Sequence, residues 1–338
     1  MYRFDNHIAA YDESRRYNRK GEIAAFPPYV TFELGNSCNF SCIMCRKTYI
    51  KEKKEELDFS VFKKCVDEIS NYGSLVRFIG YCEPLLYSKI KDAIRYVKKK
   101  GLRLHITTNG SLLNREMINA ILENEVDSVI FSFQGFTQEE DCFMRNISCK
   151  TYSNVVNKIK LLHKSRKSEK PYITISTTIT SRDNPEYETE FIKRHMCYAD
   201  QVQVTGATHF AFIEDESGIR DIEKKLGLNK PRKLKNVKCF LTNYEMKIAE
   251  NGNVYMCCGS FTDELNIGNI EKNTLFNMWH SEKAMKIRET LAFGDLDKFK
   301  NCRACQIRYD YDKIGNTIMN TMKGKNKKKK MELYAEER

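Results

Sequence analysis

Three cysteines lie within a stretch of eight residues near the start of the chain, Cys38-Asn-Phe-Ser-Cys42-Ile-Met-Cys45. A [4Fe–4S] cluster takes one thiolate per iron, and this short loop supplies three thiolates. The next histidine is His105, so no fourth ligand lies close by and one iron would stay open to a ligand other than protein. Such a site suits chemistry at the cluster. A zinc site and three unconnected thiols are the alternatives, although a structural zinc ion takes four ligands.

A second group of cysteines lies further along the chain. Its four candidate ligands are Cys239, Cys257, Cys302 and Cys305. The dipeptide Asn251-Gly252 predicts a tight hairpin turn between the first two, which would bring both to one metal. Four thiolates can hold an iron–sulfur cluster or a zinc ion. Cys258 could take the place of Cys257.

The use of cysteine also indicates the compartment. The chain has 13 cysteines, and in a reducing compartment such residues bind metals or take part in catalysis rather than form disulfides. No apolar run reaches the length of about 18 residues that a membrane span needs, and the N-terminal segment lacks the apolar stretch of a secretory signal. The sequence therefore predicts a cytoplasmic protein. Most of the remaining cysteines are expected to be buried; they are Cys65, Cys82, Cys142, Cys149 and Cys197.

Strand-like and helix-like patterns alternate from residue 29 to about 206. The expected strands are Tyr29–Leu34, Leu75–Ile79, Leu102–Thr107, Ser128–Phe133, Tyr172–Ile179 and Gln201–Thr205. The expected helices are Phe59–Tyr72, Lys89–Lys100, Arg115–Asn124, Tyr152–His163 and Glu186–Met196. This order implies parallel strands with right-handed crossovers. Because six strands are fewer than the eight of a closed barrel, we predict an α/β fold, a partial (β/α)6 TIM-like barrel with its chemistry at the C-terminal strand ends.

The rest of the chain divides around this barrel. We expect an N-terminal extension at 1–28, the barrel at 29–210, a linker at 211–238, a small C-terminal α+β domain at 239–310 and a basic tail at 311–338. In the small domain, Tyr244–Cys258 predicts strand, turn and strand. Thr274–Leu291 predicts one helix with Met285 on its apolar side. The Lys-rich tail is expected to be disordered.

Three more segments follow the second, third and fourth predicted strands. They are Gly80-Tyr81-Cys82-Glu83-Pro84, Thr107-Thr108-Asn109-Gly110, and Ser132-Phe133-Gln134-Gly135 with Arg145 further on. Together with the first cysteine loop they resemble the radical S-adenosylmethionine (radical SAM) superfamily, which has Gly-Gly-Glu-Pro and often Ser-x-Asp-Gly at the first and last of these places. Cys82 replaces the second glycine, Gln134 replaces the acid, and Met44 stands where the family often has an aromatic residue.

This resemblance implies a cofactor site and a reaction. Cys38, Cys42 and Cys45 would hold a [4Fe–4S] cluster whose open iron binds S-adenosylmethionine (SAM). The residues expected to contact SAM are Gly80, Glu83, Asn109, Ser132 and Arg145. With an electron from a flavodoxin or ferredoxin, such enzymes cleave SAM reductively to methionine and a 5′-deoxyadenosyl radical, which removes a hydrogen atom from the substrate.

The second cysteine group resembles the SPASM/twitch domains of radical SAM enzymes. The segments Asn266–Ile270 and Met278–Ser281 also look like that domain. No cysteine follows Cys305, so the pattern resembles the twitch type with a single auxiliary cluster, found in an aminocyclitol dehydrogenase subgroup. The resemblance therefore implies two [4Fe–4S] clusters per chain, the second accepting an electron from the substrate radical.

Several outcomes of such a reaction remain open. Oxidation of a small hydroxylated molecule, such as a saccharide or nucleotide-linked sugar, is favoured because the 28 residues before the first strand are too few for a peptide-leader docking domain. Modification of a peptide or protein side chain, as in sulfatase maturases, is an alternative. Radical epimerisation is another, and its candidate hydrogen donors are Cys142, Cys149, Cys197 and Cys258. No general base can be identified.

The chain is basic, with 57 Lys and Arg against 45 Asp and Glu, a net charge of +12. Such a balance favours anionic partners. A zinc or iron–sulfur protein that binds nucleic acid would account for the charge and the clustered cysteines. It would leave the open three-cysteine site and the loops at successive strand ends unexplained, so nucleic acid is not the expected partner.

Overall fold

The computed structural model describes residues 21–49, 53–178, 185–205, 232–233, 237–260, 262–303, 305 and 309–310. The basic tail and nearly all of the predicted linker lie outside these residues, as does most of the N-terminal extension. In the part of the chain that is described, no helix is long and apolar enough to cross a membrane.

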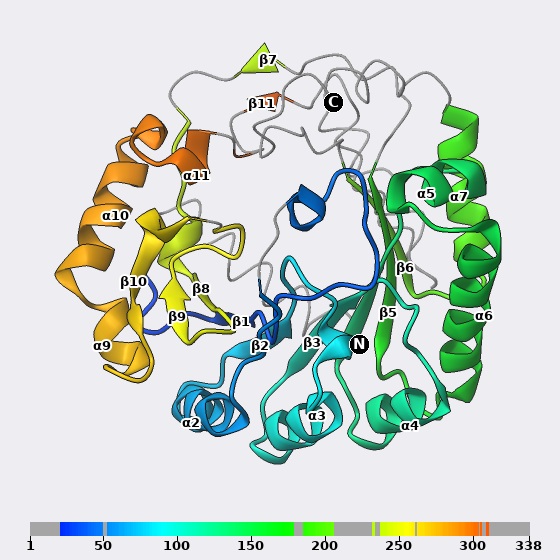
Figure 1. Cartoon of the computed structure of the whole chain (residues 1–338), viewed down its shortest axis with the longest axis horizontal. Helices are drawn as coiled ribbons and strands as arrows, with labels where there is room; N and C mark the ends of the chain where they lie inside the picture. Colours follow the sequence, from blue (N-terminus) through cyan, green and yellow to red (C-terminus); the bar gives the residue numbers. More distant parts are fainter. Residues whose placement is uncertain are drawn as a thin grey trace, which may run out of the picture.

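A nine-stranded sheet organises the described residues, in the order β10-β9-β8-β1-β2-β3-β4-β5-β6 (Figure 1). Its strands are β1 (Tyr29–Phe32), β2 (Leu75–Phe78), β3 (Leu104–Thr108), β4 (Ser128–Ser132), β5 (Tyr172–Thr178), β6 (Gln201–Thr205), β8 (Glu245–Ile248), β9 (Asn253–Tyr255) and β10 (Asn266–Asn269). Strands β1 to β6 pair in parallel, which confirms the predicted barrel strands and their order. The short β7 (Arg232–Lys233) and β11 (Tyr309–Asp310) pair separately and antiparallel.

Helices follow most of the parallel strands. They are α2 (Phe59–Ser70), α3 (Ile90–Lys99), α4 (Arg115–Glu123), α5 (Gln138–Arg145), α6 (Cys149–Ser165) and α7 (Pro185–His195), with short 3₁₀ turns η1 (Arg46–Tyr49) and η2 (Pro84–Leu86). Asn114 caps α4 as expected, since its side chain accepts a hydrogen bond from the Met117 amide at 2.8 Å. Helix α5 was not predicted, because its segment Gln-Glu-Glu-Asp is polar throughout.

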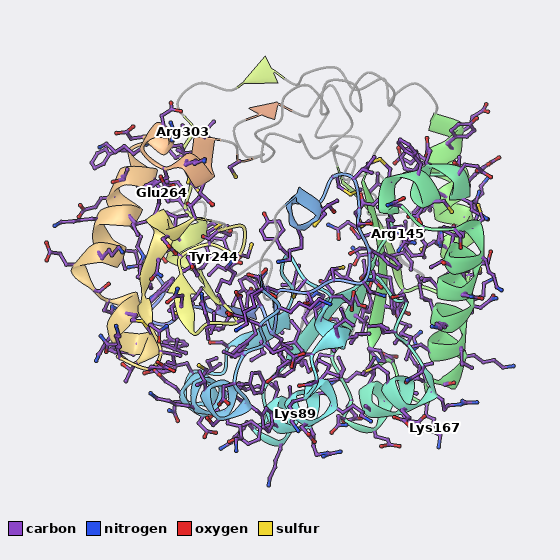
Figure 2. The ribbon with its side chains drawn as sticks, in the orientation of Figure 1. Lys89, Arg145, Lys167, Tyr244, Glu264 and Arg303 are labelled. Carbon is purple, nitrogen blue, oxygen red and sulfur yellow. The ribbon has the colours of Figure 1, made fainter. Side chains whose placement is uncertain are left out.

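The helices cover one face of the sheet. In Figure 1, α2, α3, α4 and α6 lie along the outer side of the strands, and the segment with η1 lies on the inner side. Apolar strand residues that point outward, such as Val30, Phe32 and Phe78, are completely buried in one core with the helices. The Phe32 and Phe78 rings lie 4.9 and 6.0 Å from the ring of Phe62 in α2. Figure 2 shows Lys89 and Lys167 at the outer surface and Arg145 further inside.

The C-terminal segment extends this same sheet. Strand β8 pairs in parallel with β1, with Tyr29 opposite Glu245 and Phe32 opposite Ile248. Strands β8 and β9 form the predicted hairpin, and Gly252 in its turn has φ +77°, a conformation that favours glycine. Strand β10, which was not predicted, pairs with β9. Because β8 pairs with β1, the described residues of the small domain share one sheet with the barrel.

The predicted helix Thr274–Leu291 is instead two helices, α9 (Leu275–Trp279) and α10 (Glu282–Ala292). Ser281 ends the first and caps the second, since its hydroxyl accepts a hydrogen bond from the Ala284 amide at 3.2 Å. Because the chain changes direction between the two helices, Met285 lies outside the core and is 36% exposed. Trp279 stays fully buried and donates a hydrogen bond to the Ala24 carbonyl at 2.8 Å. The short helices η3 (Leu241–Asn243), η4 (Asp263–Leu265), η5 (Leu296–Lys298) and α11 (Lys300–Arg303) complete this region.

Candidate cofactor and substrate site

The first cysteine loop follows β1, and Cys38, Cys42 and Cys45 are each half-buried in it. Burial, with a smaller contribution from the neighbouring Cys45 and Cys38 thiols, raises the pKa of Cys42 to about 12. Burial also raises the pKa of Cys38 and Cys45. The three thiols thus lie close enough to interact, and a bound cationic group would favour their thiolate forms.

This donor set fits a cluster. Among the residues that the structure describes, no three His, Cys, Asp or Glu side chains are placed to hold a metal ion. Each iron of a [4Fe–4S] cluster takes its own thiolate, so cluster ligands are spread more widely than the ligands of one ion. The loop itself is ordered by hydrogen bonds from the Cys45 amide to the Cys42 carbonyl at 2.9 Å and from the Thr48 amide to the Cys45 carbonyl at 3.0 Å.

Glu83 joins the ends of β2 and β3 behind this loop. Its carboxylate is 3% exposed and accepts hydrogen bonds from the Thr108 hydroxyl at 2.6 Å, the Asn109 amide at 2.8 Å and the Leu85 amide at 3.1 Å. Burial raises the pKa of Glu83, and these donors oppose the rise. The Asn109 side chain in turn donates to Asn39 of the cysteine loop at 2.9 Å. Glu83 and Asn109 are therefore placed to position that loop, and their contact with SAM stays a prediction.

Gly80 makes room for a buried acid. A Cβ atom at Gly80 would lie 2.5 Å from Oε1 of Glu33, far inside any normal contact. Glu33 accepts a hydrogen bond from the Tyr81 amide at 2.5 Å and forms an ion pair with Lys247 of β8 at 2.9 Å. Both members of this pair are buried. The absence of a side chain at Gly80 thus allows the Glu33–Lys247 pair to form beside the loop.

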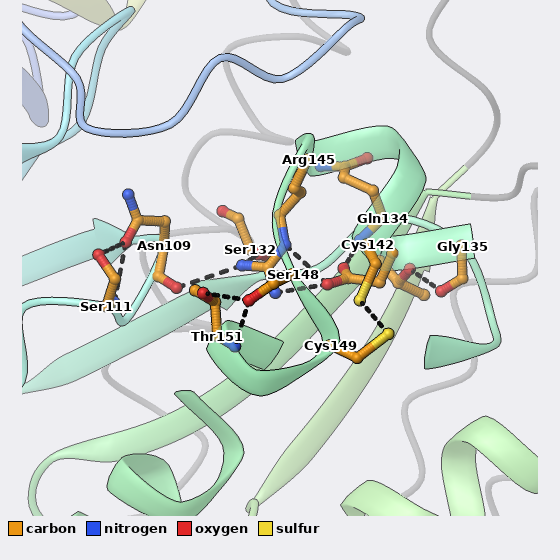
Figure 3. Close-up of polar contacts among 12 residues, drawn as sticks. Asn109, Ser111, Ser132, Gln134, Gly135, Cys142, Arg145, Ser148, Cys149 and Thr151 are labelled. Atoms are coloured by element: carbon orange, nitrogen blue, oxygen red, sulfur yellow. Dashed lines mark hydrogen bonds and ion pairs between the residues drawn. The ribbon is translucent and has the colours of Figure 1, made fainter. Parts of the chain in front are cut away.

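Arg145 joins α5 to the ends of β3 and β4 (Figure 3). Its side chain is buried, and its guanidinium donates to Asp141 at 2.8 and 2.5 Å, to the Ser132 carbonyl at 3.1 Å and to the Asn109 carbonyl at 3.3 Å. The guanidinium also lies 5.4 Å from the centre of the Phe40 ring in the cysteine loop. These contacts make Arg145 a positioning residue, and a direct contact of Arg145 or Ser132 with SAM stays a prediction.

The inner face of the sheet is polar. Residues opposite one another in register point to the same side, and one row contains Lys247, Thr31, Arg77, His105 and Ser128. A second row contains Thr107, Ile130, Thr174 and Gln201, and a third contains Ser132, Ser176 and Gln203. Most of these side chains carry hydroxyl, amide, imidazole or charged groups. The first row is largely buried, whereas Ser132, Ser176 and Gln203 of the third row are half-buried. The end of the face at this third row therefore suits a polar ligand.

The charges on this inner face are paired. Arg77 forms an ion pair with Glu245 and donates to the Thr31 hydroxyl at 2.6 Å. His105 is hydrogen-bonded to the hydroxyls of Ser128 at 2.7 Å and Thr107 at 2.9 Å. With the Glu33–Lys247 pair, these contacts leave the face with little net charge.

The second cysteine group borders the same face. Burial raises the pKa of Cys239 to about 11, and the nearby Cys305 and Cys258 thiols contribute. A hydrogen bond with Cys257, followed by burial, raises the pKa of Cys258, while Arg77 opposes the rise. The structure thus brings these cysteines together. Cys302 is buried. Its carbonyl accepts a hydrogen bond from the Cys305 amide at 3.2 Å. Cys257 and Cys258 are adjacent and hydrogen-bonded to each other, so both lie in this group.

Some residues of the site were not predicted. Glu33 and Lys247 were missed, although alternation in Tyr-Val-Thr-Phe-Glu-Leu places Glu33 on the face opposite the core residues. The expectation that most of the remaining cysteines are buried was only partly right. Cys65 and Cys142 are buried, Cys82 is half-buried, and Cys149 and Cys197 are exposed. Cys149 begins α6 and Cys197 follows the end of α7, where side chains reach solvent.

Comparison with known families finds two matches in this chain. The radical SAM superfamily model matches residues 32–194, and the model of the iron–sulfur cluster-binding domain SPASM matches residues 239–306. The first match spans the first cysteine group, strands β2 to β5 and the loops that follow β2, β3 and β4. The second spans the other cysteine group.

Two relatives and one solved structure give the context. The tungsten-containing aldehyde ferredoxin oxidoreductase cofactor-modifying protein of Pyrococcus furiosus is 28% identical over 158 residues, 46% of this chain and 44% of that protein. The S-adenosyl-L-methionine-dependent 2-deoxy-scyllo-inosamine dehydrogenase of Niallia circulans is 20% identical over 298 residues, 83% of this chain and 96% of that protein. The structure of Streptococcus suis SuiB bound to S-adenosylmethionine has the same fold, with TM-score 0.63, 14% identity, and coverage of 86% of this chain and 80% of that chain. The match to the Pyrococcus protein thus spans less than half of its length.

Proposed function

Since the chain contains a radical SAM domain followed by an iron–sulfur cluster-binding SPASM domain, we propose that it is an oxidoreductase that uses SAM to oxidise a small, uncharged, hydroxylated molecule. The observation that carries the choice of substrate is the inner face of the sheet, which is polar and bordered by both cysteine groups. The likeness to the dehydrogenase of Niallia circulans, over 96% of that protein, supports it.

The inner face selects by hydrogen bonding. Its ionic groups are already paired within the protein, as Glu33 with Lys247 and Arg77 with Glu245. The groups that remain to meet a ligand are mainly hydroxyls and amides, among them Ser132, Ser176 and Gln203. Such groups donate and accept hydrogen bonds without demanding a charged partner. A saccharide or cyclitol offers the matching hydroxyls.

The cysteines would hold the cofactors. Cys38, Cys42 and Cys45 would bind one [4Fe–4S] cluster with SAM beside it, and Cys239, Cys257, Cys302 and Cys305 would bind a second. When bound, the first cluster and SAM supply the one-electron chemistry that removes a hydrogen atom from an unactivated carbon. Glu83 and Arg145 hold the loops around that site, and the inner face orients the substrate. The reductant would be a flavodoxin or ferredoxin, and the compartment the cytoplasm.

The test is a substrate panel under anaerobic conditions. Protein with both clusters, reduced chemically, is incubated with SAM and with cyclitols, sugars, nucleotide sugars or short peptides in parallel. The expected result is 5′-deoxyadenosine that forms faster with one hydroxylated small molecule, together with a product that lacks two hydrogens. Stimulation by peptides alone would overturn the proposal and favour side-chain modification. A product isomeric with its substrate would favour epimerisation.

A further inference from the structure

Two cysteines outside both cysteine groups are in contact. Sγ of Cys142 lies 3.5 Å from Sγ of Cys149, and Figure 3 shows the two side chains pointing toward each other. Cys142 is buried at 8% exposure, whereas Cys149 is exposed. A disulfide has its sulfur atoms about 2.05 Å apart, and these two sulfur atoms are already in contact.

The backbone between them is held in one conformation. Asn146 ends α5 in the left-handed region, with φ 52° and ψ 53°. The Ile147 amide donates to the Cys142 carbonyl at 2.9 Å, and the Asn146 amide donates to the Phe143 carbonyl at 3.2 Å. This pair of hydrogen bonds is the Schellman motif, in which asparagine is a common substitute for glycine. The closeness of the two sulfurs is thus set by a defined turn.

The capping of α6 completes this arrangement. The Ser148 hydroxyl accepts a hydrogen bond from the Thr151 amide at 3.1 Å, which fixes the start of the helix where Cys149 stands. Burial raises the pKa of Cys142 to about 12, and its hydrogen bond with Cys149 adds to the rise. Cys142 therefore stays a neutral thiol, and the exposed Cys149 is the sulfur that a solute meets first.

The same turn contacts the first cysteine loop. The Ile43 amide donates to the Met144 carbonyl at 2.9 Å, and the Asn146 side chain donates to the Ser41 hydroxyl at 3.0 Å. A chemical change at Cys142 and Cys149 is therefore only a few residues from groups that hold the loop.

We propose that Cys142 and Cys149 are a dithiol site that hydrogen peroxide converts to a reversible disulfide. The Cys149 thiolate attacks a peroxide oxygen, so an S–O bond forms, the O–O bond breaks and hydroxide leaves. The Cys142 sulfur then attacks the Cys149 sulfur, so the S–S bond forms, the S–O bond breaks and a second hydroxide leaves. The two thiol protons turn both hydroxides into water. The thiols lose two electrons, which reduce one peroxide to two waters.

The test uses the protein with its clusters and one equivalent of hydrogen peroxide. After alkylation of free thiols under denaturing conditions, peptide mass spectrometry is expected to find the Cys142 and Cys149 peptides linked, and dithiothreitol is expected to release them. In Cys142→Ser the link is lost, and dimedone, which reacts with sulfenic acids, is expected to label Cys149. Cys197→Ser, which removes another exposed thiol, is the matched control and should leave the link unchanged.

Two results would overturn the proposal. One is recovery of both cysteines as alkylated thiols at a peroxide dose that already releases iron. The other is oxidation of Cys149 in the wild type to a dimedone-reactive or higher state while Cys142 stays free. Both serine variants replace sulfur by oxygen at nearly the same size, and iron content and circular dichroism confirm that each variant compared is folded.

Discussion

The two cysteine groups are built in different ways. The first takes three thiols from one loop of eight residues, and that loop is held from outside by side chains that follow other strands, such as Asn109 and Arg145. The second draws its thiols from positions between Cys239 and Cys305, brought together by the β8–β9 hairpin and the helices packed beside it. The first site thus depends on hydrogen bonds around a local loop, and the second depends on the fold of a whole segment. Loss of cysteine ligands from the first group should therefore affect mainly the reaction. Loss of ligands from the second group should affect both the reaction and the folding of its segment.

The largest effect is expected from removal of the three cysteines of the first group. Wild-type protein reconstituted without oxygen is expected to carry about eight irons per chain, four for each cluster. Changing Cys38, Cys42 and Cys45 together to Ala should leave about four and abolish SAM cleavage, measured as 5′-deoxyadenosine. Circular dichroism should stay near that of the wild type, because the loop is local. A triple variant that still cleaves SAM would place the catalytic cluster elsewhere.

Removal of one ligand from the second group should separate cleavage from oxidation. Cys305→Ala is expected to lose the second cluster and still cleave SAM slowly, because the two ligand sets share no residue. Product formation should be lost, since the substrate radical has no electron acceptor. Cleavage, product and circular dichroism are read on the same sample, with Cys197→Ala as the control. Full product formation without the second cluster would instead indicate a redox-neutral reaction.

The Glu33–Lys247 pair joins the segment after β1, which leads into the first cysteine loop, to β8 of the C-terminal segment. Lys247→Met leaves a buried carboxylate without its partner, a change that typically costs about 3–5 kcal/mol of stability. The free energy of unfolding from urea titration is the measurement. Lys286→Met, which removes an exposed pair with Glu282, should leave the free energy of unfolding close to that of the wild type, because exposed ion pairs contribute little. An equally small change for Lys247→Met would mean that water or another donor replaces Lys247.

The smallest expected effect lies away from both groups. His195 is buried between aromatic rings, including Phe191 at 4.2 Å, and burial lowers its pKa to about 3. An unfolded histidine has a pKa of about 6.5, so below that pH the unfolded chain binds a proton that the folded chain does not. The free energy of unfolding should therefore fall as pH falls from about 6.5, by up to about 1.4 kcal/mol per pH unit. His195→Gln should remove this part of the slope.

A matched variant makes that pH experiment decisive. His280 is exposed, and His280→Gln is the matched control for the loss of an imidazole. Urea titrations between about pH 5 and pH 7 measure both variants. An unchanged slope in His195→Gln would show that the acid sensitivity arises from other groups.

The sequence predicted what depends on local pattern. The six parallel strands, most helices and the hairpin at Asn251-Gly252 follow from spacing and periodicity. A capping box joins Thr137 and Glu140 at the start of α5, so that helix had a local signal although its polar composition hid it. The break of the last predicted helix at Ser281 has a similar local signal, a serine cap followed by Glu282.

What could not be predicted are the pairings between distant segments. Glu33 and Lys247 are 214 positions apart, and nothing near either residue identifies the other. The parallel pairing of β8 with β1 is of the same kind, since a strand pattern does not name its neighbour. Arg145 was expected to meet SAM, but whether its donors are used within the protein depends on where the ends of β3 and β4 lie. Such choices are made by packing in three dimensions rather than by local propensity.

The position of β1 has a consequence for synthesis of the chain. Strand β1 is the first of the described strands in sequence, yet in the sheet it lies between β2 and β8. Until β8 leaves the ribosome, one side of β1 is an edge with unpaired backbone groups, which other chains can join. The nascent barrel therefore waits for its C-terminal partner strand. A chain that stops before β8 would keep this edge open and be prone to aggregate.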